Sequence, residues 1–320
     1  MDDRRCAGRF AGRNKMSADV EVLHHAPDLV GESPLWDAQN AAIWWVDIPG
    51  RALRRLDLSE NRVVSMAMPF LPGALALSDG GKPVIAGGGG WYGLEADGTL
   101  RKLADAPSVA NDMRMNDGVV DTAGRFWAGT VPLAPSTDPR GALYRLDRDG
   151  THEALDGLRT QNGTAVSPDG RTFYLADSHP DVRTIWAFDL NVESGDLSNR
   201  RLFHRPERGR PDGAAIDAEG CYWFAEIDAG RIVRLNPDGC EIGTIELPVS
   251  RPTNLAFYDE DLSLLAVTSM SAGLNEEDRA REPLAGALLS VEAGTTGWPQ
   301  PKLSRLPEPS PERMAILRTG

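Results

Sequence analysis

Polar side chains recur at one position of a repeated sequence unit, and together they could hold a metal ion. The six positions lie 41 to 50 residues apart, and five of them carry a side-chain oxygen: Glu32, Gly73, Asn116, Asn162, Asp212 and Asn254. Converging carboxylate and amide oxygens, without His nitrogen or Cys sulfur, suit a hard cation such as Ca²⁺, Mg²⁺ or Mn²⁺ better than a thiolate-type zinc site. Asn and Asp also start many turns, but turn formation alone does not predict a shared position in the repeat. The pattern therefore predicts one divalent cation held by oxygen ligands.

A bound cation would matter for catalysis because the sequence contains no motif for a protein nucleophile. It has no GxSxG elbow, no HExxH, no P-loop and no GxGxxG followed by a helix. The glycine run Gly87–Gly90 follows an expected strand but precedes no helix, so a phosphate-binding loop is disfavoured. What remains is water activated by a divalent cation, beside a carboxylate that accepts its proton. This chemistry predicts hydrolysis of an activated ester.

Further polar side chains are predicted at the same mouth of the fold. Three arginines lie two or three residues before a repeated position: Arg114, Arg210 and Arg251. A guanidinium group is a good donor to carbonyl and hydroxyl oxygens, although each arginine could instead make a surface ion pair. His179 and Glu226 lie in loops that open on the same side, so they are additional candidates for the pocket. Asn254 is a third such candidate, with a purely structural role as its alternative.

The elements that must position these residues are short strands. Each unit has a polar or small lead residue, an apolar strand, an Asp or Ser, a turn and a second strand, and most units add a third strand. Several short strands per unit, at a period of about 40–50 residues, are typical of a β-propeller. No window keeps apolar residues at helical spacing. The sequence therefore predicts an all-β, six-bladed β-propeller with a metal site in the central channel.

The propeller is predicted to span residues 18–303. Val20–His24 is expected to pair with the last blade and close the ring, which removes an exposed strand edge. Residues 1–17 lack the apolar stretch of a signal peptide and are predicted to be a disordered extension. Residues 304–320 are predicted to form a C-terminal tail.

Composition and charge disfavour several classes of partner. The 320 residues carry 34 Lys and Arg against 47 Asp and Glu, a net charge of -13. An acidic surface repels nucleic-acid phosphates and anionic lipid, and no apolar run approaches the roughly 20 residues of a membrane helix. Three cysteines are too few and too scattered to predict a disulfide framework or a CxxC zinc site. These features predict a cytoplasmic protein without nucleic-acid or membrane partners, and they leave its oligomeric state open.

Four segments at blade spacing resemble the SMP-30/gluconolactonase/luciferin-regenerating-enzyme-like family, the regucalcin-like sugar lactonases. They are GESPLWD followed by WWVDI within 31–48, RMNDGVVDTAGRFWAGT at 114–130, QNGTAVSPDGRTFYLADS at 161–178 and RPDGAAIDAEGCYW at 210–223. The resemblance covers residues 21 to 303, approximately. It implies a six-bladed propeller with one divalent metal ion (Ca, Zn, Mg, Mn or Fe). It also implies hydrolysis of a sugar lactone, such as gluconolactone or a pentonolactone, to the aldonic acid.

Matched residue by residue, the resemblance implies three metal ligands: Glu32, Asn162 and Asp212. Arg114 and Asn116 match the substrate-contacting positions of an RxND motif, and Asp212 matches the carboxylate proposed as the base. Some members of the family hold sugar hydroxyls with an acidic residue in the blade-three loop, whereas its counterpart in this chain falls near Ala134. Hydroxyl recognition must then come from other residues, which leaves the identity of the lactone open.

Other functions remain as alternatives to sugar lactone hydrolysis. A calcium-binding regulator without catalysis would use the same ligands but would not need Arg114. A propeller esterase of the phosphotriesterase or paraoxonase kind would hydrolyse non-sugar esters at the same metal. A WD40-type interaction platform is disfavoured, because Trp36-Asp37 is a single WD dipeptide and the other repeats lack one.

Overall fold

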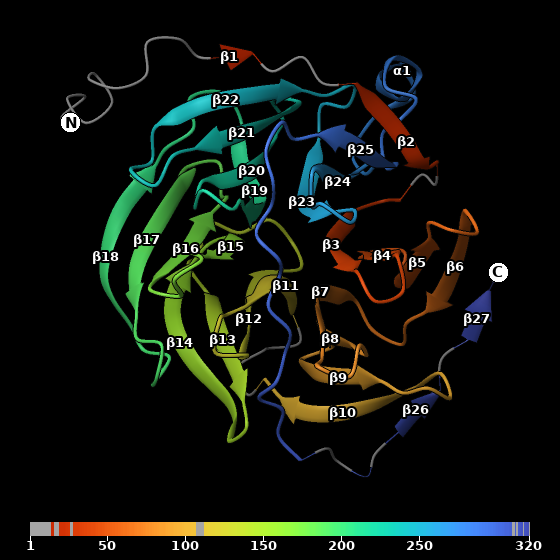
Figure 1. Ribbon diagram of the computed structural model, residues 1–320, viewed down its shortest axis with the longest axis vertical. Helices are drawn as coiled ribbons and strands as arrows, with labels where there is room; N and C mark the ends of the chain where they lie inside the picture. Colours follow the sequence, from red (N-terminus) through yellow and green to blue (C-terminus); the bar gives the residue numbers. More distant parts are fainter. Residues whose placement is uncertain are drawn as a thin grey trace.

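Six β-sheets, each with four antiparallel strands at its centre, stand around a channel like the blades of a propeller (Figure 1). This computed structural model describes residues 14–15, 19–25, 28–106, 112–308, 311, 313–315 and 317–319. In blades one to five, four consecutive strands run in sequence order from the channel to the rim. The predicted all-β, six-bladed propeller is confirmed.

The first three blades are built from the first half of the chain, and their strands are named from the channel outward. Blade one contains β3 (Gly31–Asp37), β4 (Ala42–Asp47), β5 (Ala52–Asp57) and β6 (Arg62–Ala67). Blade two contains β7 (Pro72–Leu77), β8 (Pro83–Gly87), β9 (Gly90–Leu94) and β10 (Thr99–Asp105). Blade three contains β11 (Met113–Val120), β12 (Phe126–Pro132), β13 (Gly141–Asp147) and β14 (Gly150–Leu158).

The remaining blades follow the same order. Blade four contains β15 (Gln161–Val166), β16 (Thr172–Asp177), β17 (Thr184–Leu190) and β18 (Leu197–His204). Blade five contains β19 (Arg210–Ile216), β20 (Tyr222–Ile227), β21 (Arg231–Leu235) and β22 (Glu241–Glu246). Blade six contains β23 (Pro252–Tyr258), β24 (Leu264–Ser269), β25 (Leu288–Glu292) and β2 (Val20–His24). The short helix α1 (Glu276–Arg281) lies in the loop between β24 and β25, and no helix of the described residues is long and apolar enough to cross a membrane.

The two ends of the chain add to the rim of the propeller. Strand β2 pairs antiparallel with β25, so the predicted closure of the ring by Val20–His24 is confirmed. The predicted extension, residues 1–17, falls mostly outside the described residues, and its β1 (Asn14–Lys15) pairs parallel with β22. Within the predicted tail, β26 (Arg313–Ala315) pairs with β10 and β27 (Leu317–Thr319) pairs with β6. The segment after residue 303 therefore contributes strands to blades two and one.

Buried tryptophans anchor the second strands of the blades. The indole N–H groups of Trp127 and Trp223 donate to Asp121 and Asp217, the aspartates six residues earlier, each at 2.8 Å. All four side chains are almost fully buried. A buried Trp usually has a hydrogen-bond partner for its N–H. The repeated Asp-to-Trp spacing therefore fixes the turn between an inner strand and its neighbour.

Every inner strand is irregular at the position that the repeat singled out. The pairing with the second strand shifts register just after six residues: Glu32, Pro72, Met115, Asn162, Pro211 and Pro252. A β-bulge bends its strand and redirects side chains, which lets the lead residues converge on the channel. Gly73 is the one lead residue without a side-chain oxygen, and packing explains it: a Cβ at this position would lie 2.5 Å from the Met115 carbonyl oxygen.

The segment after β25 closes one end of the channel. It crosses the centre of the ring (Figure 1, blue) and forms hydrogen bonds with the last residues of the inner strands β19 and β7. Trp298 N donates to Ile216 O at 3.0 Å, and Leu303 N donates to Leu77 O at 2.8 Å. The lead residues stand at the opposite ends of the inner strands. The site they form therefore opens on the other face of the propeller.

Candidate active site

The predicted polar residues meet across the channel, as their hydrogen bonds show. Asn254 Nδ2 of blade six donates to Glu32 of blade one at 2.9 Å and to Asp117 of blade three at 3.1 Å. Asn116 Nδ2 of blade three donates to Asn162 Oδ1 of blade four at 3.0 Å. The oxygen-bearing lead residues are all buried, with exposed fractions of 4 to 6%: Glu32, Asn116, Asn162, Asp212 and Asn254. Residues from distant parts of the sequence thus form one polar cluster.

Arg114 lies beside this cluster and is held by Asn116. Its Nη1 donates to Asn116 Oδ1 at 2.5 Å and to the Met115 carbonyl at 3.1 Å. The Asn116 amide nitrogen donates to the Gln161 carbonyl at 2.6 Å as well as to Asn162. Both polar atoms of the Asn116 side chain are therefore engaged by the protein. Asn116 positions its neighbours, while Arg114 keeps further N–H donors for a ligand.

Asn254 presents its nitrogen, rather than its oxygen, to the carboxylates. Its Oδ1 accepts the backbone N–H of Leu255 at 2.8 Å, and its Nδ2 donates to Glu32 and Asp117. An amide nitrogen carries hydrogens and cannot coordinate a cation. Of the two roles that the sequence left open for Asn254, this geometry supports the structural one.

Asp117 is a channel carboxylate that sequence reasoning missed. It accepts the backbone N–H of Thr164 at 2.7 Å, the Thr164 hydroxyl at 2.6 Å and the Asn254 amide. Burial raises the pKa of Asp117 above its ordinary value, against the effect of these hydrogen bonds. Asp117 directly follows Asn116 within the bulge of β11, and the other five units have uncharged residues at this place. That single acidic residue was the signal available in the sequence.

Three carboxylates share the channel, and burial raises the pKa of each. Burial, followed by the charge of Asp117, raises the pKa of Glu32 to about 7. Burial, followed by the charge of Glu32, raises the pKa of Asp212 well above its ordinary value. Burial lowers the pKa of the Arg114 guanidinium, against the effect of the charges of Glu32 and Asp212. A cation among these groups would favour their ionised forms.

Asp212 is the residue that best fits a cation ligand. Its Oδ1 is buried and has no hydrogen-bond partner among the described residues. An unsatisfied buried polar group costs about 1–3 kcal/mol, and more when it is charged. By contrast, Asp117 accepts three hydrogen bonds and is already satisfied. With the oxygens of Glu32 and Asn162, Asp212 offers the two carboxylates and one amide that suit a hard divalent ion.

A second group of potential ligands lies at Asp217, Glu219 and Cys221, whose ligand atoms come within 4.8 Å of one another. Asp217 Oδ2 already accepts hydrogen bonds from Trp223 at 2.8 Å and from Arg234 at 2.6 Å. Arg234 also donates to Glu219 at 2.7 Å. Burial raises the pKa of the Cys221 thiol to about 11, and a metal binds the thiolate. This group is therefore a structural ion pair.

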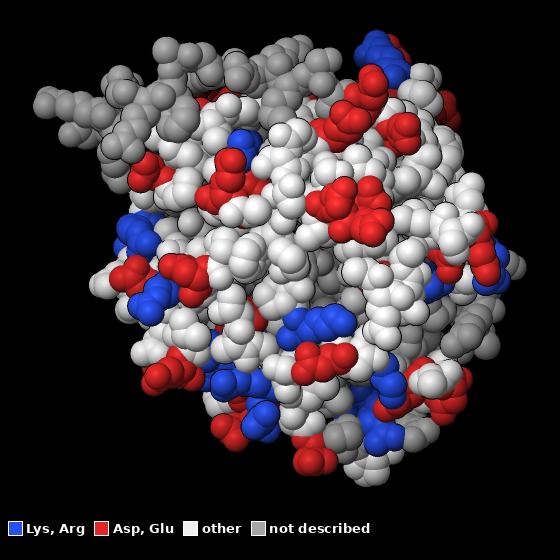
Figure 2. Space-filling view, viewed as in Figure 1, with Lys and Arg blue, Asp and Glu red and all other residues white. Residues whose placement is uncertain are grey.

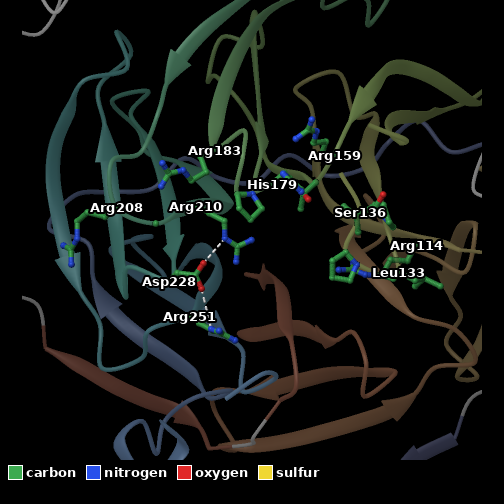
Figure 3. Close-up of a pocket in the computed structure, with 17 residues that line it drawn as sticks. Arg114, Leu133, Ser136, Arg159, His179, Arg183, Arg208, Arg210, Asp228 and Arg251 are labelled. Atoms are coloured by element: carbon green, nitrogen blue, oxygen red, sulfur yellow. Dashed lines mark hydrogen bonds and ion pairs between the residues drawn. The ribbon is translucent and has the colours of Figure 1, made fainter. Parts of the chain in front are cut away.

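A cavity of about 700 Å³ adjoins the channel cluster (Figure 3). Its walls come from the end of β12 and the loop that follows it (residues 131–136), the loop after β16 with His179, and the start of β19 with Arg210. Arg114 lines the cavity too. Burial raises the pKa of Asp212, and the charges of Arg210 and Arg114 partly oppose this effect. Another cavity, of about 810 Å³, has Trp36 and Phe257 in its wall and contains none of the predicted site residues. The first cavity, whose lining residues Arg114 and Arg210 interact electrostatically with Asp212, is the candidate substrate pocket.

His179 lines this pocket, whereas the structure gives Glu226 another role. Glu226 Oε1 accepts the backbone N–H of Gly209 at 2.7 Å, and its Oε2 pairs with Arg231. Asp177 has the same place at the end of a second strand and accepts the backbone N–H of Thr160 at 3.0 Å. Glu226 is therefore a repeated structural carboxylate that holds the entry to an inner strand. Among the described residues that line the pocket, Glu226 is not present.

Two of the predicted rim arginines share a carboxylate that the sequence did not single out. Arg210 Nε donates to Asp228 Oδ2 at 2.8 Å, and Arg251 Nε lies 3.5 Å from Asp228 Oδ1 (Figure 3). All three residues line the pocket, as does Ala134. Asp228 thus holds the guanidinium groups of Arg210 and Arg251 in place at the rim. On the blade-three side, the pocket wall has the uncharged Ala134.

Comparisons with known proteins agree with this architecture. A family model described as the SMP-30/Gluconolactonase/LRE-like region matches residues 30–271. The chain is 36% identical to a 6-deoxy-6-sulfogluconolactonase of Pseudomonas putida, over 89% of this chain and 99% of that protein. It is 34% identical to regucalcin of Danio rerio, over 88% and 97% of the two chains. A solved structure of regucalcin from Agrobacterium tumefaciens, described as a calcium-binding protein, has a TM-score of 0.85 at 29% identity, covering 90% of this chain and 98% of that one.

Proposed function

The chain belongs to the SMP-30/gluconolactonase/LRE-like family, and from this premise we propose that it hydrolyses a sugar lactone to the aldonic acid with the help of a divalent cation. The observation that carries the proposal is Asp212. It is a buried carboxylate whose Oδ1 accepts no hydrogen bond from the described residues, and its charge interacts with two arginines of the pocket. The relative named as a sulfogluconolactonase supports the reaction class.

Three residues would hold the cation: Glu32, Asn162 and Asp212. They provide oxygen ligands from blades one, four and five. When bound, a divalent cation polarises a carbonyl oxygen and lowers the pKa of a water molecule. The description of the Agrobacterium regucalcin as calcium-binding supports a hard ion, and Ca, Mg, Mn, Zn and Fe are the ions to compare.

Asp212 acts as the general base. Its buried carboxylate leaves Oδ1 without a hydrogen bond from the described residues, so an ionised Asp212 can accept a proton from a water molecule within hydrogen-bond reach. A water molecule adds to the lactone carbonyl carbon and gives its proton to Asp212. The bond from that carbon to the ring oxygen then breaks, and the proton passes to the departing ring oxygen. The products are the free hydroxyl group and carboxyl group of the aldonic acid.

Arg114 binds the substrate from the pocket wall. The hydrogen bonds to Asn116 and to the Met115 carbonyl use its Nη1 group, and its Nε and Nη2 groups can reach the ring or carbonyl oxygen of a lactone. Asn116 contributes by fixing both Arg114 and Asn162. His179 lines the same pocket and is a candidate for contact with a sugar hydroxyl.

Replacement of Asp212 tests the assignment. Asp212→Asn keeps the shape of the side chain and removes the base, so turnover should fall by about 10²–10⁴-fold, the usual contribution of a general base. Asp138→Asn is the matched control, because Asp138 is exposed in the loop after β12. Near-normal hydrolysis by Asp212→Asn would exclude Asp212 as the base.

A calcium-binding regulator without catalysis is the second candidate, and the description of the Agrobacterium relative favours considering it. It predicts tight cation binding with no acid release from any lactone. A propeller esterase would instead release acid from non-sugar esters and leave aldonolactones intact. Titration of acid release with both substrate types therefore separates the three functions.

A further inference from the structure

The wall of the pocket is strongly cationic, although the chain as a whole has a net charge of -13. A single carboxylate, Asp228, lines the pocket among the described residues. Six of the lining residues are arginines: Arg114, Arg159, Arg183, Arg208, Arg210 and Arg251. The face shown in Figure 2 carries both acidic and basic side chains instead of one basic patch. Six arginines thus lie together at this one pocket.

Most of these arginines have protein partners nearby. Asp228 pairs with Arg210 and Arg251. Arg159 lies 3.3 Å from Asp181, and Arg208 lies 3.5 Å from Glu246; both of these carboxylate side chains are exposed. Exposed pairs of this kind are weak and are screened by salt. They leave much of the positive charge available to a ligand.

Of the six lining arginines, Arg183 is the one whose side chain has no partner among the described residues. Its guanidinium group makes no hydrogen bond or ion pair with any described residue, and the residue is half-buried at the pocket wall. Its backbone has a φ of 42° and donates to the His179 carbonyl at 3.0 Å. A positive φ is unfavourable for a residue other than glycine. Figure 3 shows Arg183 beside Arg210 and His179 at one side of the pocket.

The opposite wall does not supply a compensating negative charge. It consists of residues 131–136, Val-Pro-Leu-Ala-Pro-Ser, which contain no acidic side chain. An uncharged wall facing a group of arginines would let an anion enter without repulsion. A neutral sugar lactone gives Arg183 no opposite charge to bind.

We infer that the substrate is a lactone with a second, permanently anionic group away from the ring carbonyl, and that Arg183 binds this group as the specificity-determining residue. A sulfonate or a phosphate ester at the terminal carbon fits this description, because guanidinium groups bind both through charge-assisted hydrogen bonds. Arg210, which lies beside Arg183 in Figure 3, supplies further positive charge. The inference rests on the proposed lactone hydrolysis, with the carbonyl at Asp212 and the anion at Arg183.

The test compares three lactones at the same ionic strength: 6-phosphogluconolactone, 6-deoxy-6-sulfogluconolactone and glucono-δ-lactone. The wild-type protein should prefer at least one anionic lactone by about tenfold or more in kcat/KM, mainly through a lower KM. The preference should shrink as salt rises, since salt screens charge interactions. The more favoured of the two anions identifies whether the group is a phosphate or a sulfonate.

Arg183→Gln should reduce the ratio of anionic to neutral kcat/KM towards one, because its effect on the anionic lactones should exceed its effect on the neutral lactone, whereas Arg183→Lys should restore part of the ratio. The control is Arg62→Gln, which removes the same charge from an exposed site on β6 that pairs with Glu60. The inference would be overturned if the wild-type protein hydrolysed the neutral lactone as fast as, or faster than, both anionic lactones. It would also be overturned if Arg183→Gln lowered kcat/KM equally for all three lactones.

Binding of the hydrolysis products separates failure of this inference from failure of the proposed function. Calorimetric titration with 6-phosphogluconate, the 6-sulfonate product and gluconate measures the anion site without turnover. Selective binding of an anionic product without hydrolysis of any lactone would refute the proposed function and retain the anion site. Hydrolysis without selectivity in rate or binding would refute only the anion site.

Discussion

Removal of the Asp117 carboxylate should destabilise the propeller without abolishing cation binding. Asp117→Ala takes away the acceptor of the Thr164 N–H, the Thr164 hydroxyl and one hydrogen bond of the Asn254 amide. Asn254 keeps Glu32 as an acceptor, so two donors on Thr164 remain without a partner. At about 1–3 kcal/mol for each buried unsatisfied group, the free energy of unfolding should fall by about 2–6 kcal/mol.

Urea unfolding of the Asp117→Ala variant measures this loss, with the slope of the transition as a check that the unfolded state is unchanged. Thr164→Val provides the matched control, since it removes one of the same hydrogen bonds from the other side. In a double-mutant cycle the two changes should be strongly non-additive, because they share a contact. Calorimetry should still detect a divalent cation in Asp117→Ala. Unchanged stability of Asp117→Ala would refute the structural role of Asp117. Loss of cation binding in Asp117→Ala but not in Glu32→Gln would show that Asp117, and not Glu32, is the ligand.

Other residues give further predictions. Because the folded pKa of Glu32, about 7, lies above its ordinary value of 4.5, the metal-free folded state holds a proton that the unfolded state has already released. Its contribution to stability is therefore present below pH 4.5 and lost as the pH rises towards 7; thermal unfolding with a chelator should show this slope in wild type and a smaller slope in Glu32→Gln, where Asp117 and Asp212 still have raised pKa values. Cation affinity should rise over the same pH range, since the cation displaces the proton, and an affinity independent of pH would contradict the assignment of Glu32. Arg114→Met should lower kcat/KM for a lactone by about 10–100-fold through loss of a charge-assisted hydrogen bond, measured by steady-state acid release; unchanged kinetics would exclude Arg114 from substrate binding. Glu226→Gln should lower the free energy of unfolding by about 1–3 kcal/mol, because Arg231 loses a buried ionic partner, and it should leave KM unchanged. A raised KM with wild-type stability would contradict the structural role and indicate that Glu226 binds substrate.

The propeller was predictable because its repeat is visible as a spacing of apolar strands and turns. The same spacing identified the lead residues, since a shared position in the repeat becomes a shared position on the channel. Asp117 was missed because the repeat assigns one channel residue to each blade, whereas the bulge in β11 places two consecutive residues at the channel. A repeat alignment with one position per blade does not foresee such a bulge.

The roles of Asn254 and Glu226 show a second limit of sequence reasoning. The orientation of the Asn254 amide is determined by the Leu255 N–H and by carboxylates on two other blades. The role of Glu226 depends on a buried arginine five residues later, Arg231. Six arginines line one pocket, and the repeat had placed only three of them at this mouth: Arg114, Arg210 and Arg251. The other three, like the amide orientation of Asn254 and the ion pair of Glu226, follow from tertiary contacts that the sequence pattern does not show.

Acid release from aldonolactones after chelation, followed by restoration of single cations, tests the central claim most directly. The protein stripped with a chelator should be inactive on all lactones. Addition of at least one of Ca²⁺, Mg²⁺, Mn²⁺, Zn²⁺ or Fe²⁺ should restore hydrolysis in wild type and not in Asp212→Asn. Hydrolysis that persists without any cation, or no hydrolysis of any lactone with every cation, would contradict the account.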